Sequence, residues 1–283
     1  MIKIAITGAG GYIGRHVLSQ LLDMNFEVTA IIYPGSAPVL GANNIELDIL
    51  NVSEEVILSS FKGFDAVLHL AWTAGFNHHD PSHIDNVMKH YHFIKSLINA
   101  GITNISIAGT MHEVGYHVGE ITENTACNPS NPYGIAKNFL RQLCMYEMQK
   151  SHVNIKWLRM YYITGDDCHS NSIFAKILKA EKDGRNTFPL NSGEMLYDFI
   201  TIKELAKQIS AATVQKDILG IINCCTGKPR SLRTVVESFI TENNLKIVPE
   251  YNVFPVREYD SPALWGSNSI INEIIENEGR NGF

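Results

Sequence analysis

The sequence predicts an α/β protein built around a doubly wound parallel sheet, and three observations support this. Short runs rich in β-branched residues alternate with helical stretches through the first half of the chain. A glycine-rich turn joins the first expected strand to the first expected helix. The composition, with 45% hydrophobic and 18% charged residues among 283, supplies a substantial core and excludes disordered, collagen-like and coiled-coil chains.

Each expected element follows from the local pattern. Strands are expected at the β-branched runs, which are Ile2–Thr7, Glu27–Ile32, Ile45–Leu47, Asp65–Leu70, Asn104–Ala108 and Val153–Arg159. The clearest helices between them are Tyr12–Met24, Ser82–Ala100 and Asn131–Lys150. Pro132 stands near the start of the last helix, where its missing N–H costs least.

The pattern loosens after about Asp166. Gly, Pro, Asn and Ser cluster at residues 164–172 and 184–193, and the elements between these clusters are shorter. We therefore expect a core at residues 1–165 and a small C-terminal lobe over residues 166–283. Late elements at about 200–225, which include Thr201–Val214 and Gly220–Cys224, are expected to return to the core.

Charge and cysteine content exclude several classes of protein. The chain has 23 basic and 29 acidic residues, a net charge of −6, whereas general binders of nucleic acid or anionic membranes need the opposite balance. No apolar run approaches the roughly 18 residues of a membrane span. The five cysteines contain no C-x-x-C pair, and the opening MIKIAIT reads as a strand rather than a secretion signal. A cytoplasmic location is expected.

The glycine-rich turn has a specific pattern. Gly8, Gly11 and Gly14 form G-x-x-G-x-x-G between the first strand and the first helix. Without Cβ atoms the chain can turn tightly, approach a pyrophosphate and pack helix on strand, while the helix N-terminus supplies N–H donors. An ordinary glycine-rich turn is the alternative. The strand–turn–helix context favours dinucleotide binding, and hence a Rossmann-type core.

The residues after the second strand bear on the choice of dinucleotide. NAD sites usually place an acid about 20 residues after the glycines, on the ribose 2′-OH. Here the strand ends in IIYPGS, without an acid, and Glu27 lies at its other end. Arg15 could reach a 2′-phosphate, or it could be a solvated helix residue. We therefore expect NADP(H) to be favoured over NAD(H).

A tyrosine and a lysine are spaced for acid–base chemistry. Tyr133 and Lys137 form Y-x-x-x-K, which places both side chains on one helical face. A neighbouring ammonium lowers the pKa of a phenol, which can then give a proton to a carbonyl oxygen. Thr110 follows the fifth strand, where a hydroxyl points into the crevice that binds ligands. The alternative is that Tyr133 and Lys137 are simply an exposed pair on a helix, and the position of Thr110 disfavours it.

These motifs resemble those of the extended short-chain dehydrogenase/reductases, in the branch that acts on nucleotide sugars. The loop TGAGGYIG, the stretches HLAW (69–72), LRMYYITG (158–165) and YDFITIKELA (197–206), and the active-site Thr110, Tyr133 and Lys137 all match the family pattern. The resemblance implies that Asp48 contacts adenine, a role compatible with capping a helix. The expected cofactor contacts are Gly8, Gly11, Tyr12, Ile13, Gly14, Arg15, Asp48, Leu70, Ala71, Trp72 and Lys137.

The departures from the family pattern narrow the reaction. Family dehydratases carry Asp-Glu after the catalytic Thr, but this chain has Met111 and His112, which disfavours dehydration. Tyr162 replaces a substrate-contacting Asn, and Tyr197 replaces an Arg. By the same resemblance Arg257 binds the substrate diphosphate and Phe174 and Phe188 border the nucleotide, although a surface salt bridge and core packing are alternatives. The expected substrate contacts are Met111, His112, Tyr162, Phe174, Phe188 and Arg257.

The histidines near residue 80 do not predict a metal site. Asp80-Pro81-Ser82 reads as a helix start between His79 and His83, so the histidines would not share a helical face. We interpret His78, His79 and His83 as loop and cap residues near the cofactor cleft. No metal is expected.

The predicted function is therefore NADPH-dependent reduction of the C4 ketone of a nucleotide-activated 4-keto-6-deoxysugar, in deoxysugar biosynthesis. The segments GTMHEVGY and NPYGIAKN favour dTDP sugars, with dTDP-fucose or dTDP-6-deoxytalose as the product. The alternatives are a C4 epimerase that retains its cofactor and a non-catalytic NADP(H) sensor. The expected partners are a nucleotide-diphosphate sugar and, in a homodimer, a second copy of the chain, but neither nucleic acid nor membrane.

Overall fold

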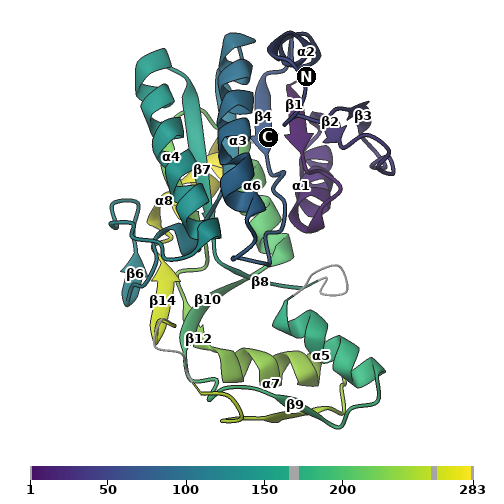
Figure 1. Ribbon diagram of the computed structural model, residues 1–283, viewed down its shortest axis with the longest axis vertical. Helices are drawn as coiled ribbons and strands as arrows, with labels where there is room; N and C mark the ends of the chain where they lie inside the picture. The colour runs from purple at the N-terminus through teal and green to yellow at the C-terminus, as the bar shows by residue number, and fades with distance from the viewer. Residues whose placement is uncertain (1, 166–171, 256–259, 282–283) are drawn as a thin grey trace.

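The computed structural model describes residues 2–165, 172–255 and 260–281 (Figure 1). Within these ranges seven parallel strands form the main sheet, in the order β11-β7-β5-β4-β1-β2-β3. They are β1 (Lys3–Thr7), β2 (Glu27–Ile32), β3 (Asn43–Glu46), β4 (Ala66–His69), β5 (Asn104–Thr110), β7 (Asn154–Met160) and β11 (Gly220–Cys224). Because the chain winds outwards in both directions from β1 and β4, the predicted Rossmann-type, doubly wound sheet is confirmed.

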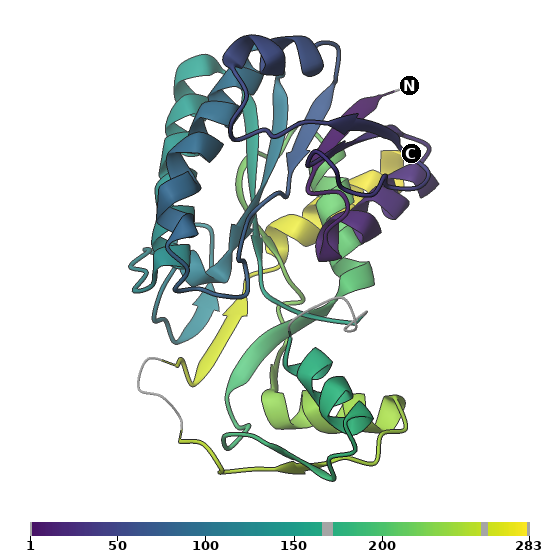
Figure 2. The same ribbon diagram turned by 45° about the vertical axis from the view of Figure 1, so that its right-hand side comes forward.

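Helices cover both faces of this sheet, as Figure 2 shows. On one face lie α1 (Tyr12–Asp23), α6 (Ile202–Val214) and α8 (Ser269–Asn281). On the other lie α2 (Glu54–Ser60), α3 (Ser82–Asn99) and α4 (Pro132–Ser151). Each layer buries its own cluster of aliphatic side chains against the strands, so the sheet is apolar on both sides and reads as continuous hydrophobic runs.

Two local features place the site residues. Asn131 caps α4, because its side chain accepts a hydrogen bond from the Gly134 N–H at 2.9 Å, and Pro132 occupies the first turn as predicted. Strand β5 runs to Thr110, because that residue pairs with Met160 of β7. This pairing places the Thr110 hydroxyl at the carboxyl edge of the sheet.

The C-terminal lobe lies below that edge in Figures 1 and 2 and has its own apolar cluster. One of its sheets has the order β12-β10-β14-β6, with β8 added on β10, and a second pairs β13 with β9. The strands are β6 (Gly119–Ile121), β8 (Tyr162–Thr164), β9 (Thr187–Pro189), β10 (Leu196–Thr201), β12 (Pro229–Ser231), β13 (Val248–Glu250) and β14 (Ala263–Gly266). The remaining elements there are α5 (Ile173–Lys182) and α7 (Leu232–Glu242), and η1 (Met111–Glu113) follows β5.

The chain crosses between core and lobe several times. Strand β6, from the first half of the chain, pairs with β14 near the other end, and α8 then returns to pack on α6 and β11. The carboxyl ends of the core strands therefore face the lobe, which is the edge where open α/β sheets bind ligands. Among the described residues no helix is long and apolar enough to cross a membrane.

Candidate active site

A cavity of about 580 Å³ lies between the carboxyl edge of the main sheet and the lobe. Its volume is within the range of ligand pockets, about 300–1,000 Å³. It brings together thirteen of the residues predicted from the sequence: Gly8, Gly11, Tyr12, Ile13, Gly14, Leu70, Trp72, Thr110, His112, Tyr133, Lys137, Tyr162 and Phe174.

The glycine loop has the geometry that a dinucleotide requires. Gly8 has φ +73°, and a Cβ there would lie 2.8 Å from the backbone nitrogen of Ala71. A Cβ on Gly14 would lie 2.1 Å from the Gly8 carbonyl oxygen, so only glycine permits this contact of turn and helix. Gly11 occupies the N-cap of α1, and no side chain of the described part of the chain caps that position. The first-turn N–H groups therefore suit a pyrophosphate.

Tyr133 and Thr110 lie together at this edge. Thr110 ends β5, and its Oγ1 accepts a hydrogen bond from the His112 N–H at 3.3 Å. Tyr133 lies in the first turn of α4, and its N–H donates to the carbonyl oxygen of His78 at 3.1 Å. Burial raises the pKa of the Tyr133 phenol to about 12, and a hydrogen bond with Thr110 offsets part of this rise. The phenol is therefore protonated at neutral pH.

Lys137 is buried one turn further along α4. Its Nζ donates to the carbonyl oxygen of Ala108 at 2.8 Å and lies 3.7 Å from the centre of the Trp72 ring. Burial lowers its pKa to about 7, while Glu113 acts in the opposite direction. The expected lowering of the Tyr133 pKa by Lys137 is not what the structure shows. The ammonium faces the strand end and the indole, and burial dominates the titration of the phenol.

Trp72 packs against a set of histidines, and the sequence pattern did not connect these residues with one another. Its Nε1 donates to Nδ1 of His83 at 2.9 Å, and its ring stacks on His90 at 4.4 Å and 17°. His90 in turn meets His69, whose other ring nitrogen lies 2.7 Å from the Thr7 hydroxyl. Burial lowers the pKa of His69 to about 3 and that of His90 to about 2, so these rings are neutral. Trp72 and these histidine rings form a packed layer beneath Lys137, which we call the floor.

The lobe supplies an aromatic wall opposite Tyr133. The rings of Tyr162 and Tyr197 are 4.7 Å apart, and Tyr162 lies 5.5 Å from Phe199. Phe174 lines the cavity and is otherwise buried in the lobe cluster. Tyr162 and Tyr197 thus fill with aromatic surface the two positions where the resemblance expects Asn and Arg.

Several predicted residues lie away from this wall. In the part of the chain that the structure describes, Arg15, Asp48, Ala71, Met111 and Phe188 are not among the residues lining the cavity. Arg257 lies outside the described residues. Met111 is buried in the lobe cluster, and Phe188 packs against the same cluster. The substrate contacts predicted for these two side chains therefore have no direct counterpart in the cavity wall.

Two of these residues have local partners instead. The carboxylate of Asp48 accepts hydrogen bonds from the Leu50 N–H at 3.2 Å and the Asn51 side chain at 2.8 Å. These bonds make it a turn residue and not the expected helix cap, because Ser53 is the N-cap of α2. The Arg15 guanidinium lies 6.0 Å from the centre of the Tyr12 ring.

His78 is the functional candidate that sequence reasoning missed. It lines the cavity, and its ring lies parallel to that of Tyr133. The sequence placed His78 with His79 and His83 among loop and cap residues near the cofactor cleft, but it gave no sign of the contact with Tyr133. In the described part of the chain no group of three or more His, Cys, Asp or Glu side chains could hold a metal ion.

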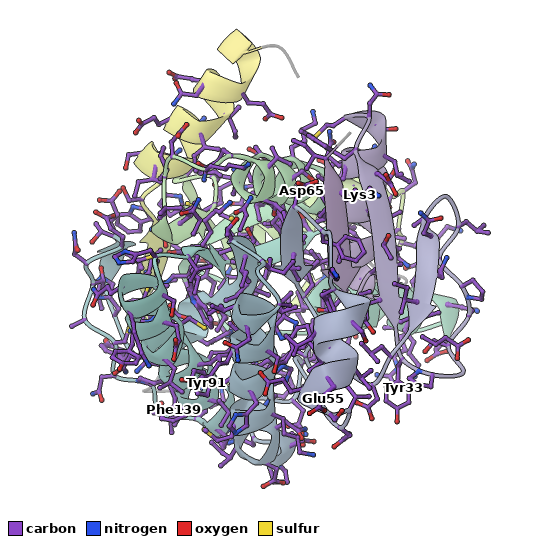
Figure 3. The ribbon with its side chains drawn as sticks, turned by 90° about the horizontal axis from the view of Figure 1, so that it is seen from above. Lys3, Tyr33, Glu55, Asp65, Tyr91 and Phe139 are labelled. Carbon is purple, nitrogen blue, oxygen red and sulfur yellow. The ribbon has the colours of Figure 1, made fainter. Side chains whose placement is uncertain are left out.

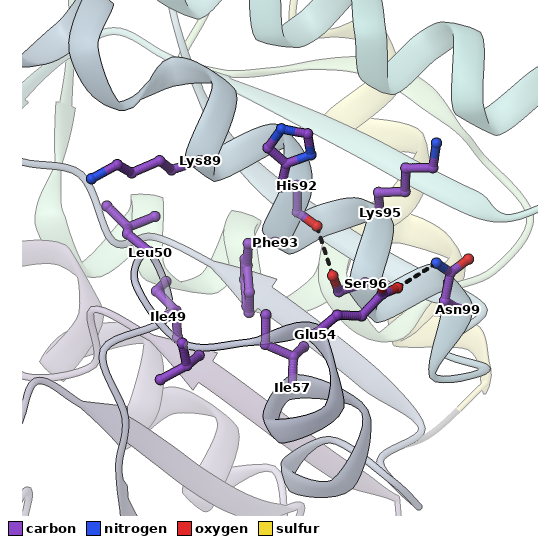
Figure 4. A pocket seen from close by; sticks show the side chains of 11 residues that line it. Ile49, Leu50, Glu54, Ile57, Lys89, His92, Phe93, Lys95, Ser96 and Asn99 are labelled. Carbon is purple, nitrogen blue, oxygen red and sulfur yellow. Dashed lines mark hydrogen bonds between the residues drawn. The ribbon is translucent and has the colours of Figure 1, made fainter.

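A second cavity, of about 480 Å³, lies between α2 and α3 (Figure 4). Ser96 donates to the His92 carbonyl oxygen at 2.9 Å, and Asn99 donates to the Glu54 carboxylate at 2.6 Å. Among the described residues, none of those predicted for catalysis or cofactor binding lines it. The first cavity is therefore the candidate active site.

Comparisons with known proteins agree with this geometry. The model of the NAD dependent epimerase/dehydratase family matches residues 4–225. The chain is 57% identical over 271 residues, 94% of this chain and 100% of the relative, to a dTDP-6-deoxy-L-talose 4-dehydrogenase (NAD(+)) of Aggregatibacter actinomycetemcomitans. It is 25% identical over 236 residues, 77% of this chain and 75% of the relative, to an uncharacterized UDP-glucose epimerase of Bacillus subtilis (strain 168).

Solved structures share the fold at low identity. MoeE5 in complex with UDP-glucuronic acid and NAD superposes with a TM-score of 0.83 at 18% identity, covering 97% of this chain and 92% of that one. The UDP-N-acetylglucosamine 4-epimerase from Methanobrevibacter ruminantium M1 superposes with a TM-score of 0.82 at 21% identity, covering 96% and 91%.

The prediction that NADP(H) is favoured over NAD(H) is wrong. The relative at 57% identity is named for NAD(+), and MoeE5 is a complex with NAD. The structure shows what the sequence argument overlooked. Glu46 of β3 pairs with Ile32 at the end of β2, and its carboxylate accepts a hydrogen bond from the Gly35 N–H at 3.2 Å. An acid does stand beside the end of β2, but the neighbouring strand supplies it.

Proposed function

The chain belongs to the NAD dependent epimerase/dehydratase family, and from this premise we propose that it is an NAD(H)-dependent oxidoreductase acting at C4 of a dTDP-6-deoxyhexose. The proposed reaction interconverts the C4 hydroxyl of dTDP-6-deoxy-L-talose and the corresponding 4-keto sugar. The assembly of Thr110, Tyr133 and Lys137 around one cavity carries this proposal. The name of the relative at 57% identity supports the sugar and the nucleotide.

Residues 1–165 are proposed to hold the dinucleotide, and the lobe, mainly within 166–283, the nucleotide sugar. The first-turn N–H groups of α1 would meet the pyrophosphate, because the glycines keep that approach clear. The carboxylate of Glu46, beside the end of β2, would accept from a ribose hydroxyl and repel a 2′-phosphate. Lys137, one turn along α4 from Tyr133, would donate to the ribose next to the reacting ring. When bound, the nicotinamide supplies a hydride acceptor or donor for C4.

The chain's own residues would manage the proton. Thr110 would hold the C4 oxygen through its hydroxyl, beside the Tyr133 phenol. In reduction Tyr133 would give its proton to that oxygen, and in oxidation its phenolate would take the proton from the C4 hydroxyl. Because the pKa of Tyr133 is raised to about 12, the phenol would be protonated at neutral pH and could donate its proton in the reduction. Oxidation would become faster as pH rises, since more of the phenol is ionised.

The aromatic wall supports a 6-deoxy sugar. Tyr162, Tyr197 and Phe199 offer apolar ring surface to the cavity, which suits a methyl group at C5 better than a hydroxymethyl or carboxylate group. A buried Arg at position 197 would instead have favoured an anionic group.

The test is a substrate panel with absorbance at the NADH band. With dTDP-6-deoxy-L-talose and NAD⁺ we expect stoichiometric NADH formation, and NMR should show loss of the C4 proton from the sugar. A C4 epimerase would convert the sugar without net NADH, and a sensor would bind dinucleotide without turning over any sugar. Conversion of the sugar without net NADH, or dinucleotide binding without turnover, would refute the proposal. UDP-, GDP- and CDP-linked sugars test the choice of nucleotide.

A homodimer is also proposed. The outward faces of α3 and α4 expose Ile84, Met88, Ile135, Phe139 and Tyr146, and Figure 3 labels Phe139 on this side of the molecule. Light scattering after gel filtration should give twice the mass of the chain, and Phe139→Glu should halve it. A monomer at every concentration would contradict the proposal.

A further inference from the structure

His78 contacts the catalytic tyrosine at two points. Its ring lies parallel to the Tyr133 ring, with the ring centres 4.9 Å apart and an angle of 10° between the planes. Its carbonyl oxygen accepts a hydrogen bond from the Tyr133 N–H at 3.1 Å. The segment after β4 is thus attached both to the first turn of α4 and to the side chain that turn carries.

His112 also packs against His78. These two rings lie 4.2 Å apart at an angle of 58°, and the His112 backbone N–H is bonded to Thr110. The ring centres of His112 and Tyr133 are 6.0 Å apart, so the three rings form one cluster in which His78 contacts both of the others.

The loop that carries His78 is itself held in place. The Asn77 N–H donates to the Ala74 carbonyl oxygen at 2.8 Å, where Ala74 has the left-handed φ of 54°. The Asn77 carbonyl oxygen lies 2.8 Å from Nε2 of His83. Since Nδ1 of His83 accepts a hydrogen bond from Trp72, its Nε2 donates to the Asn77 carbonyl oxygen. The ring of His78 is thus fixed relative to the floor under Lys137.

We propose that His78 is a positioning residue, whose ring stacks on Tyr133 and fixes the direction in which the phenol hydroxyl meets the C4 oxygen. This inference rests on the proposed function. The ring acts through its face, so its nitrogens are not required. Burial, His83 and His79 all lower the pKa of His78, which keeps the ring uncharged at neutral pH. A small misalignment of a proton donor is enough to slow proton transfer strongly.

The test compares two substitutions at one position. His78→Ala removes the stack and should lower kcat about tenfold while KM for the sugar stays within about twofold. His78→Phe keeps a flat ring and should restore kcat to within about threefold of wild type. His79→Ala, a neighbouring exposed histidine, is the matched control and should be unchanged. The proposal is overturned if His78→Ala keeps wild-type kcat, if His78→Phe is as slow as His78→Ala, or if only KM rises.

A second readout does not depend on turnover. In protein with labelled tyrosine, the Tyr133 ring resonances, identified by their loss in Tyr133→Phe, should carry ring-current shifts from His78. These shifts should vanish in His78→Ala and persist in His78→Phe; resonances that do not move in His78→Ala would refute the stack. The proposed function fails separately, if the wild type oxidises no dTDP sugar.

Discussion

Tyr133 shows how far residue identity and residue environment can differ. The Y-x-x-x-K spacing singled out Tyr133 and Lys137, and both reach the same cavity. Their electrostatic relation was predicted wrongly, because the pKa of Tyr133 is raised by burial and the ammonium of Lys137 is directed at Ala108 and Trp72. Spacing along a helix indicates which side chains share a face, whereas desolvation depends on everything packed around them.

Replacing Tyr133 by Phe tests its role as proton donor. We expect Tyr133→Phe to lower kcat by about 100-fold or more, because positioned acids commonly contribute that much. NAD⁺ binding, followed by calorimetry, should be unchanged, since the ring and its stack on His78 remain. Tyr146→Phe, on the exposed side of α4, is the control. Turnover of Tyr133→Phe near the wild-type rate would contradict the assignment.

Glu46 is the residue-scale test of cofactor choice. We expect Glu46→Gln to shift the ratio of NAD⁺ to NADP⁺ affinity about tenfold towards NADP⁺, because a carboxylate beside the ribose favours a hydroxyl and repels a phosphate. Calorimetric titration of both dinucleotides measures this. Glu55→Gln, exposed on α2, should leave the ratio unaltered. An unaltered ratio in Glu46→Gln would mean that another group discriminates.

At the scale of elements, boundaries follow from pairing as much as from composition. Helix α4 begins at Pro132, near its predicted start, and β5 runs to Thr110 because β7 continues alongside it. Helix α6 ends against a lysine from the sheet. Lys156 of β7 is buried and donates to the carbonyl oxygens of Thr213 at 3.1 Å and Gln215 at 2.6 Å. This lysine satisfies carbonyls that the end of a helix leaves free.

Burial of Lys156 makes stability depend on pH. Burial, assisted by Lys216, lowers its pKa from 10.5 to about 7. Between these values the unfolded chain binds the extra proton. The free energy of unfolding therefore rises with pH, by at most about 1.4 kcal/mol per unit. Between pH 7 and pH 9, the free energy of unfolding measured by urea denaturation should rise by about 1 to 2 kcal/mol more in the wild type than in Lys156→Met. An equal difference at both pH values would show an ordinary pKa.

At the scale of the molecule, the cavity exists because the lobe is built from both halves of the chain. Strand β6 joins β14, and β8 joins β10, so the aromatic wall faces the carboxyl edge of the core sheet. Ligands that bind on the two sides should therefore each stabilise the folded chain.

Thermal unfolding measures this stabilisation. NAD⁺ at about 100 times its Kd should add about 2.7 kcal/mol. For a chain of this size that raises Tm by about 4–5 °C. dTDP should raise it further, and NADP⁺ at the same concentration should raise it less than NAD⁺. Equal shifts with the two dinucleotides, or none with NAD⁺, would contradict the proposed cofactor.

Local pattern sufficed for the main strands and helices, the glycine loop, Thr110, Tyr133 and Lys137, and the family resemblance supplied the other predicted residues that line the cavity. Strand runs, a glycine turn and a helix cap are contacts between near neighbours, so a linear sequence records them. Only the folded structure shows Glu46 beside β2, the His78 ring stacked on Tyr133, and the pKa shifts of the site. Glu46 reaches Gly35 through strand register, and His78 reaches Tyr133 through a loop packed on another helix. Such contacts join different elements of the fold, which a local pattern does not record, and the burial that shifts each pKa depends on every residue packed around the group.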